Sequence, residues 1–288
     1  MGPSIIRFVL AWLGIVLLVT IPNANLRAQD SDEPVRIFYD TRVVTGHSTE
    51  LSAEGQMKMI ISHRFGEISS GAFELFGLDQ ANIRIGFDYG ISDRFNIGIA
   101  RSSQGKTVDG FVKYGLLQQR ENGSPIALTF LGAASINGLR QPDDRENKFS
   151  HRLDYTVQAL AARRLSDRIS VMLTPSYTHR NLVSTDSINH DVLALGGTVR
   201  YLLNKRLTLS GQYFYVAPNQ LEERFTNSLG IGIDIETKGH VFQLYLGNSR
   251  GMQEALFITE TVGELLDGDI HFGFSITRDF QVRAKRRI

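Results

Sequence analysis

The chain has 288 residues, with 31 basic and 30 acidic side chains, a formal net charge of +1 and no cysteine. The lack of cysteine excludes an acylated lipoprotein, disulfide bonds and thiolate metal sites. The near balance of charge argues against nucleic acid as a partner, since that partner favours a basic field.

The first 28 residues have the order of a cleaved secretory signal peptide. Arg7 is the only charge before an uncharged run, Phe8–Ile21, and Ala28 is a small residue at which cleavage can occur. That run of about 14 residues falls short of the ~20 that a membrane-spanning helix requires. We therefore expect export with removal of residues 1–28, in preference to a membrane anchor.

The next segment, residues 29–55, is predicted to lie outside the barrel wall described below. Val35–Val44 could form a strand, but as a barrel strand it would place its N-terminal end outside the cell. Bacterial single-chain barrels have an even number of strands and both chain ends in the periplasm. Residues 29–55 are therefore expected to be a periplasmic arm or an insert in the lumen.

From about residue 56 to the C-terminus, apolar and polar residues alternate with a period of two. In Asn82–Gly90, for example, Ile83, Ile85 and Phe87 fall on one face, and polar residues and glycines fall on the other. A helix would repeat near 3.6 residues instead. The pattern predicts about twelve strands, at residues 56–66, 81–91, 94–102, 106–118, 125–136, 150–164, 168–180, 190–203, 206–216, 226–236, 240–248 and 269–280.

Strand length and turn spacing favour a membrane barrel over a soluble sandwich. The predicted strands have about nine to thirteen residues, close to the nine to eleven of a tilted transmembrane strand and longer than the five or six of soluble strands. Short turns alternate with long loops, which in outer-membrane barrels are periplasmic and external respectively. The fold class is therefore predicted to be all-β: a closed, transmembrane, up-and-down antiparallel barrel over residues 56–280, with a basic tail at 281–288.

The alternation assigns side chains to the two faces of the wall. The residues predicted to face lipid are Ile83, Ile85, Phe87, Leu207, Leu209, Leu229, Ile231, Ile233, Phe272 and Phe274. The charged residues predicted to line the lumen are Arg64, Arg84, Asp88, Lys113, Asp154, Arg200, Asp234 and Glu236. Such charges could select solutes in a channel or form a network that fills the barrel. Twelve strands lie between filled eight-stranded barrels and open sixteen-stranded porins, so both interpretations remain open.

Two chemical alternatives, a hydrolase and a metal site, are disfavoured by the sequence. The string Tyr177-Thr178-His179-Arg180-Asn181 is similar to part of a barrel phospholipase motif, with Asn189 downstream, but residue 181 has no hydroxyl to act as a nucleophile. Ser184 and Ser187 have no fixed spacing to His179. The histidines at 63, 179, 190, 240 and 271 lack the close spacing of a zinc site. We expect no enzyme, no metal site and no cofactor.

Several strings, in order along the chain, resemble one known family. They are His63-Arg64-Phe65-Gly66, Leu75-Phe76-Gly77-Leu78-Asp79, Tyr89-Gly90-Ile91-Ser92-Asp93-Arg94, Glu236-Thr237-Lys238-Gly239-His240-Val241-Phe242, and Gly273-Phe274 with Arg278-Asp279-Phe280. The family is an uncharacterised barrel family found mainly in Bacteroidetes, domain of unknown function 5777, and the resemblance covers about residues 35–280. It implies an outer-membrane barrel and brings no catalytic residues.

The sequence thus predicts a protein of the bacterial outer membrane whose partners are membrane lipid and the barrel-assembly machinery. The leading functional hypothesis is a narrow channel for small solutes. The alternative is an occluded structural or accessory barrel that serves a periplasmic or surface partner, and an outer-membrane hydrolase is the third hypothesis. The alternatives differ in whether the lumen is open and in where residues 29–55 lie.

Overall fold

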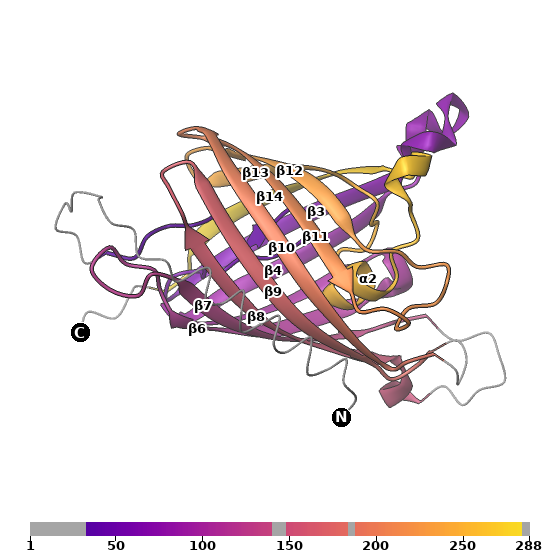
Figure 1. Ribbon diagram of the computed structural model, residues 1–288, viewed down its shortest axis with the longest axis horizontal. Coiled ribbons are helices and arrows are strands. Elements are labelled where there is room, and N and C mark those ends of the chain that lie inside the picture. The colour runs from indigo at the N-terminus through magenta and orange to yellow at the C-terminus, as the bar shows by residue number, and fades with distance from the viewer. Residues whose placement is uncertain (1–32, 140–147, 184–187, 284–288) are drawn as a thin grey trace.

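The computed structural model describes residues 33–139, 148–183 and 188–283. The predicted signal peptide and most of the basic tail, residues 284–288, lie outside the described residues. Twelve antiparallel strands form a closed barrel, in which each strand pairs with its neighbours in sequence and the last pairs with the first (Figure 1). The predicted fold class is confirmed.

The observed strand boundaries differ from the predicted ones by three residues at most. The barrel strands are β3 (Gln56–Glu67), β4 (Asn82–Ser92), β5 (Phe95–Ser102), β6 (Val108–Leu117), β7 (Ala127–Ile136), β8 (Leu153–Arg164), β9 (Ile169–Arg180), β10 (Asp191–Asn204), β11 (Leu207–Val216), β12 (Leu229–Glu236), β13 (His240–Gly247) and β14 (His271–Gln281). β14 extends one residue into the predicted tail, because Gln281 pairs with Gln56.

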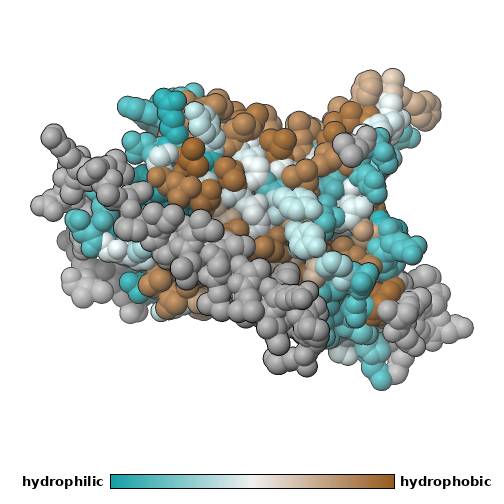
Figure 2. All heavy atoms as spheres, viewed as in Figure 1, coloured by the Kyte–Doolittle hydropathy of each residue, from teal (hydrophilic) through white to brown (hydrophobic). Residues whose placement is uncertain are grey.

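One end of the barrel carries short turns and the other carries long loops with short helices (Figure 1). These helices are η1 (Ile68–Ser70), η2 (Ala72–Gly77), η3 (Gln104–Lys106), η4 (Phe149–Arg152), α2 (Glu254–Thr259) and η5 (Leu265–Asp267). Within the described residues, no helix is both long enough and apolar enough to cross a membrane. Figure 2 shows apolar side chains along the flank of the barrel and hydrophilic ones at its rims.

Residues 36–52 lie inside the barrel, and we call this segment the plug. It contains a two-stranded hairpin, β1 (Arg42–Val43) and β2 (Gly46–His47), which forms its own small sheet apart from the wall. Most of its side chains are buried, among them Phe38, which is 1% exposed, and Val43, which is 0% exposed. The structure thus places this segment in the lumen, and Val35–Val44 is not a strand of the wall.

Glycines on the inner face of the wall give the plug room to approach. A Cβ atom at Gly90 would lie 2.6 Å from the Ser52 carbonyl oxygen, and one at Gly230 would lie 2.9 Å from the Val44 side chain. Both distances are shorter than a real Cβ atom tolerates. The inward glycines of β4 and β12 therefore leave the space that the plug occupies inside the barrel.

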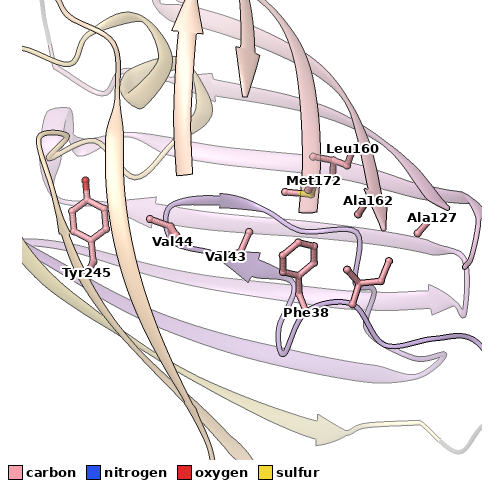
Figure 3. Close-up of a cluster of buried hydrophobic side chains, with 9 residues drawn as sticks. Phe38, Val43, Val44, Ala127, Leu160, Ala162, Met172 and Tyr245 are labelled. Carbon is pink, nitrogen blue, oxygen red and sulfur yellow. The ribbon is translucent and has the colours of Figure 1, made fainter. Parts of the chain in front are cut away.

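The plug also packs against apolar side chains of the wall. Apolar residues on the inner face were not predicted from the sequence. Phe38 and Val43 belong to one buried cluster with Leu160 and Met172, which point inward from β8 and β9 (Figure 3). Burial of such side chains stabilises the assembly by about 25 cal/mol per Å² of apolar surface. The inner face under the plug is therefore mixed, with apolar side chains such as Leu160 and Met172 beside polar ones.

The long-loop end is closed by the connection between β13 and β14. Its helix α2 turns into the barrel, where Phe257 and Ile258 pack against Phe214 and Val192 of the inner wall. All four side chains are at most 2% exposed. The lumen is thus filled by the plug from the short-turn end and by α2 from the other.

Candidate functional site

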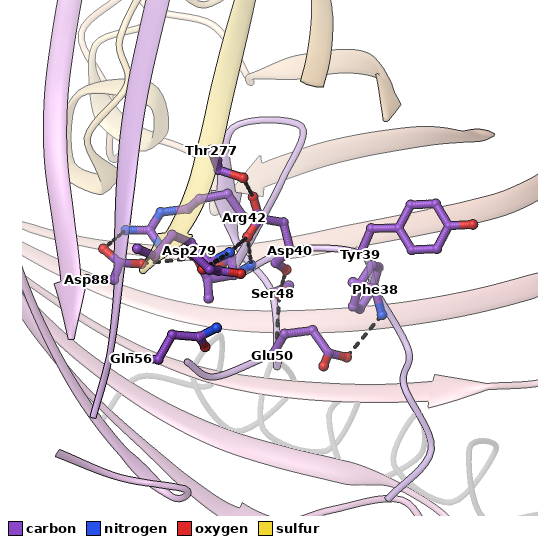
Figure 4. Close-up of polar contacts among 12 residues, drawn as sticks. Phe38, Tyr39, Asp40, Arg42, Ser48, Glu50, Gln56, Asp88, Thr277 and Asp279 are labelled. Carbon is purple, nitrogen blue, oxygen red and sulfur yellow. Dashed lines mark hydrogen bonds and ion pairs between the residues drawn. The ribbon is translucent and has the colours of Figure 1, made fainter. Parts of the chain in front are cut away.

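The site that the fold builds is the contact between the plug and the inner wall. Arg42 of the plug forms an ion pair with Asp88 of β4, with 3.0 Å between guanidinium nitrogen and carboxylate oxygen. The Thr41 hydroxyl donates to the same carboxylate at 3.0 Å (Figure 4). Both charged side chains are under 10% exposed, so each depends on the other for a counter-charge.

A second ion pair joins the plug to the place where the barrel closes. Asp40 accepts from the Lys58 ammonium of β3 at 2.7 Å and from the Thr277 hydroxyl of β14 at 2.6 Å (Figure 4). Lys58 also pairs with Asp279 of β14 at 2.8 Å. The plug is therefore bonded to both strands of the closing seam.

Glu50 organises the plug internally. Its carboxylate accepts the backbone N–H groups of Ile37 and Phe38 at 2.9 and 3.0 Å, and its backbone carbonyl accepts from the Lys113 ammonium at 2.6 Å. Burial raises the pKa of the Glu50 carboxyl above its ordinary value, while the two backbone donors act in the opposite direction. These bonds fold residues 36–50 into one compact unit.

The plug and α2 meet in the middle of the lumen. His47 and Glu254 approach to 3.4 Å, with side chains 2% and 8% exposed. Burial, aided by Arg42 and Lys113, lowers the pKa of His47 well below its ordinary value, and burial raises the pKa of Glu254. Burial therefore disfavours the charged form of each of these two side chains.

Arg84 and Asp88 share a face of β4 but do not pair with each other. Arg84 reaches across β5 to Asp109 of β6, with its Nε atom 3.2 Å from one carboxylate oxygen and a second, shorter contact to the other oxygen. This two-pronged geometry is the strongest form of an arginine–carboxylate pair. Asp88 pairs instead with Arg42 of the plug.

The other predicted lumen residues also lie on the inner face, and each has its own environment. Lys113, Arg64, Arg200 and Asp234 are at most 4% exposed, Asp154 is partly buried beside Glu254, and the Glu236 side chain is 29% exposed. Asp234 accepts from Thr208 and Gln243, both at 2.9 Å. Glu236 pairs with Arg36 at 2.7 Å at the short-turn rim.

The residues predicted to face lipid lie on the outer face. Ile83, Ile85, Phe87, Leu209 and Ile231 are between 38% and 54% exposed, and the remaining five, Leu207, Leu229, Ile233, Phe272 and Phe274, are half-buried. Neighbouring outward side chains cover part of that second group; the Phe274 ring, for example, stacks on His63 with 4.9 Å between centroids.

Several interior residues were missed by the sequence analysis. Lys58, Asp109 and Arg180 are at most 6% exposed on the inner face, and the two-residue alternation of their strands could have identified them. Asp40 and Arg42 carry no such signal, because the plug has no regular strand long enough to show a period.

The hydrolase motif does not assemble a nucleophile with its base in the described residues. His179 contacts Asp191 at 2.6 Å through Nδ1 and Asn181 at 3.0 Å through Nε2, and neither partner has a hydroxyl. Ser184 and Ser187 lie outside the described residues. Within 33–139, 148–183 and 188–283, no three histidine or acidic side chains are arranged to hold a metal ion.

A family model described as a membrane-bound β-barrel domain, domain of unknown function 5777, matches residues 38–280. No curated protein matches the chain. The NanC porin structure has 9% identity, covers 78% of this chain and 98% of its own, and has a TM-score of 0.50. The KdgM porin is also similar, with 9% identity, 78% of this chain and 99% of its own chain covered, and a TM-score of 0.47. An outer-membrane channel from Pseudomonas putida F1 has 12% identity, covers 80% of this chain and 97% of its own, and has a TM-score of 0.48. At such identities the likeness concerns the fold alone.

Proposed function

The chain belongs to the family of membrane-bound β-barrel domains, and on that premise we propose that it is an outer-membrane channel for small polar solutes that the plug holds closed. One observation carries the proposal: a separate segment of chain fills the lumen, in addition to the side chains of the wall. A segment that is not part of the hydrogen-bonded wall can move without breaking the barrel.

The chemistry of the contact supports a displaceable plug. Much of it consists of ion pairs and hydrogen bonds, among them Arg42–Asp88, Asp40–Lys58 and the donation from Gln243 to the Arg42 carbonyl. Water can replace such partners when the plug leaves, whereas a dry apolar core would have no substitute. The vacated wall would present charged side chains to solutes, as in selective pores.

A reversible lock tests the proposal. A Cβ atom at Gly232 would lie 3.5 Å from the Val44 Cα, close to the geometry of a disulfide, and the chain has no native cysteine. We expect the oxidised Val44→Cys/Gly232→Cys protein to show no conductance in planar bilayers. Adding Asp40→Asn to this double variant removes one ion pair that holds the plug. After reduction of the disulfide, we expect the fraction of time that the triple variant conducts to be at least about ten-fold higher than in its oxidised form.

The control is Val44→Cys alone, which cannot form the lock and should respond to neither oxidant nor reductant. Conductance of the oxidised double variant at the level of the reduced one would show that the plug does not close the pathway. Absence of conductance in all of these proteins, including the reduced variant with Asp40→Asn, would favour the accessory barrel instead.

The accessory barrel is the second candidate, and a surface feature favours it. The connection between β3 and β4 projects beyond the long-loop end and carries exposed apolar side chains, with Phe73 93%, Phe76 56% and Leu75 54% exposed (Figures 1 and 2). A contiguous apolar patch of this kind commonly marks a protein interaction site. A surface partner at this loop would fit a barrel that conducts nothing.

A photo-crosslinking residue in place of Phe73 would test this candidate in intact outer membranes. We expect one discrete crosslinked product if a partner covers the loop, and loss of that product when Phe76→Ser is added. The same crosslinker at exposed Ile99, on the barrel flank, serves as the control. Identical products at both positions would indicate random collision in the membrane.

A further inference from the structure

Arg64 is a buried guanidinium without a carboxylate partner in the described part of the chain. It is 2% exposed on the inner face of β3. Its Nη atoms donate to the carbonyls of Val44 and His63 at 3.3 and 3.2 Å, and the group lies 3.7 Å from the centroid of the Tyr245 ring. Its Nε–H has no hydrogen-bond partner among the described residues. None of these neighbours supplies a negative charge.

Arg64 lines a small cavity together with two other arginines. Arg42 from the plug and Arg84 from β4 border the same space, whose volume is about 20 Å³. Arg42 and Arg84 are already paired, with Asp88 and Asp109 respectively. Of the three arginines around this cavity, Arg64 is therefore the one that has no ion pair with a carboxylate among the described residues.

We propose that this cavity is a binding site for a small inorganic anion of halide size. A buried charge is costly unless an opposite charge accompanies it, and the Arg64 Nε–H is a donor still to be used. The volume exceeds the 10–15 Å³ that one water-sized species requires, and it is too small for a sugar or an organic acid while the plug is in place. The hydroxyl of Ser62, on the same wall, adds a further polar group to the lining.

The site lies on the boundary between plug and wall. Arg42 and Val44 come from the plug, whereas Arg64 and Arg84 come from the wall. An anion bound there would attract both sides and so help to hold the plug. If the plug leaves, as the proposed function requires, Arg64 remains on the wall without a counter-charge and favours anionic solutes. That last consequence rests on the proposed function, while the site itself does not.

Bromide is the probe, because its anomalous scattering distinguishes it from water. Crystals of the full mature chain, grown in sodium bromide, should show an anomalous peak in the cavity within contact distance of the Arg64 guanidinium. Arg64→Gln should abolish the peak. Arg200→Gln removes the same charge from another buried position on the inner wall and should leave the peak unchanged.

A measurement in solution covers the case in which a variant does not crystallise. An anion that binds the folded state alone raises its thermal stability. The unfolding temperature, read from the change in gel migration of samples heated in detergent, should therefore rise by a few degrees in bromide relative to gluconate at equal ionic strength. We expect this shift in the wild type and in Arg200→Gln, with loss in Arg64→Gln and partial retention in Arg64→Lys.

Water without anomalous signal in the wild-type cavity would overturn the proposal, as would an equal peak in Arg64→Gln. Both measurements are made on the closed protein. A missing anion therefore leaves the channel proposal untouched, and a barrel that never conducts leaves the anion site untouched.

Discussion

Arg84→Gln is expected to lower the free energy of unfolding by about 3–5 kcal/mol, the typical cost of removing one partner of a buried ion pair. The substitution leaves the Asp109 carboxylate, whose side chain is 7% exposed, without its two-pronged partner. Urea unfolding in lipid vesicles, followed by circular dichroism, would measure the loss. Circular dichroism is preferred because the one tryptophan, Trp12, lies in the predicted signal peptide.

Two variants give this prediction its controls. Arg101→Gln, on the exposed face of the neighbouring strand β5, should change stability by less than about 0.5 kcal/mol. Arg84→Gln/Asp109→Asn should recover part of the loss, because no buried charge is then left alone. A loss below about 1 kcal/mol for Arg84→Gln, in the range of solvent-exposed pairs, would mean that water reaches the pair and that the lumen is wet.

Ile231→Arg is expected to destabilise the barrel by about 2–4 kcal/mol, the cost of a cation on the lipid face near the bilayer midplane. Ile231 is 54% exposed on β12 and is opposite Gly211, midway along β11. The same unfolding assay applies. The prediction depends on the outer face meeting lipid.

Ile235→Arg is the matched comparison, because Ile235 lies on the same face of the same strand, next to the turn that ends β12. The cost of a charge falls to about 0–1 kcal/mol near the membrane interface. Equal losses at the two positions would contradict the depth dependence and place this face away from the hydrocarbon.

The wall of the barrel could be predicted from the sequence because its physics is local. Lipid on one side and a polar lumen on the other impose a two-residue period on every strand, and that period survives in β4 and β12 without any knowledge of their partners. Boundaries shifted where a short helix replaced the predicted start of a strand, as at η4 before Leu153.

The contents of the lumen could not be predicted in the same way. Arg84 and Asp88 are four residues apart on one face, yet each pairs with a different segment, Asp109 of β6 and Arg42 of the plug. Such pairings depend on distances between segments that are remote in sequence. Met172 and Phe214 are apolar residues at positions of the polar inner face. Their presence in the sequence was one indication that an apolar segment would pack against the inner wall there.

The contacts of Asp40 have a consequence for the order in which the molecule forms. Its carboxylate bonds Lys58 on β3 and Thr277 on β14, two strands that must find each other from opposite ends of the chain before the last row of hydrogen bonds can form. The entropy lost in bringing chain ends together grows with the length between them. A plug that already lies against β3 offers β14 a ready acceptor, so it can guide the final strand into register. Once that row is complete, the hairpin is enclosed, and its folding and the completion of the wall become a single event.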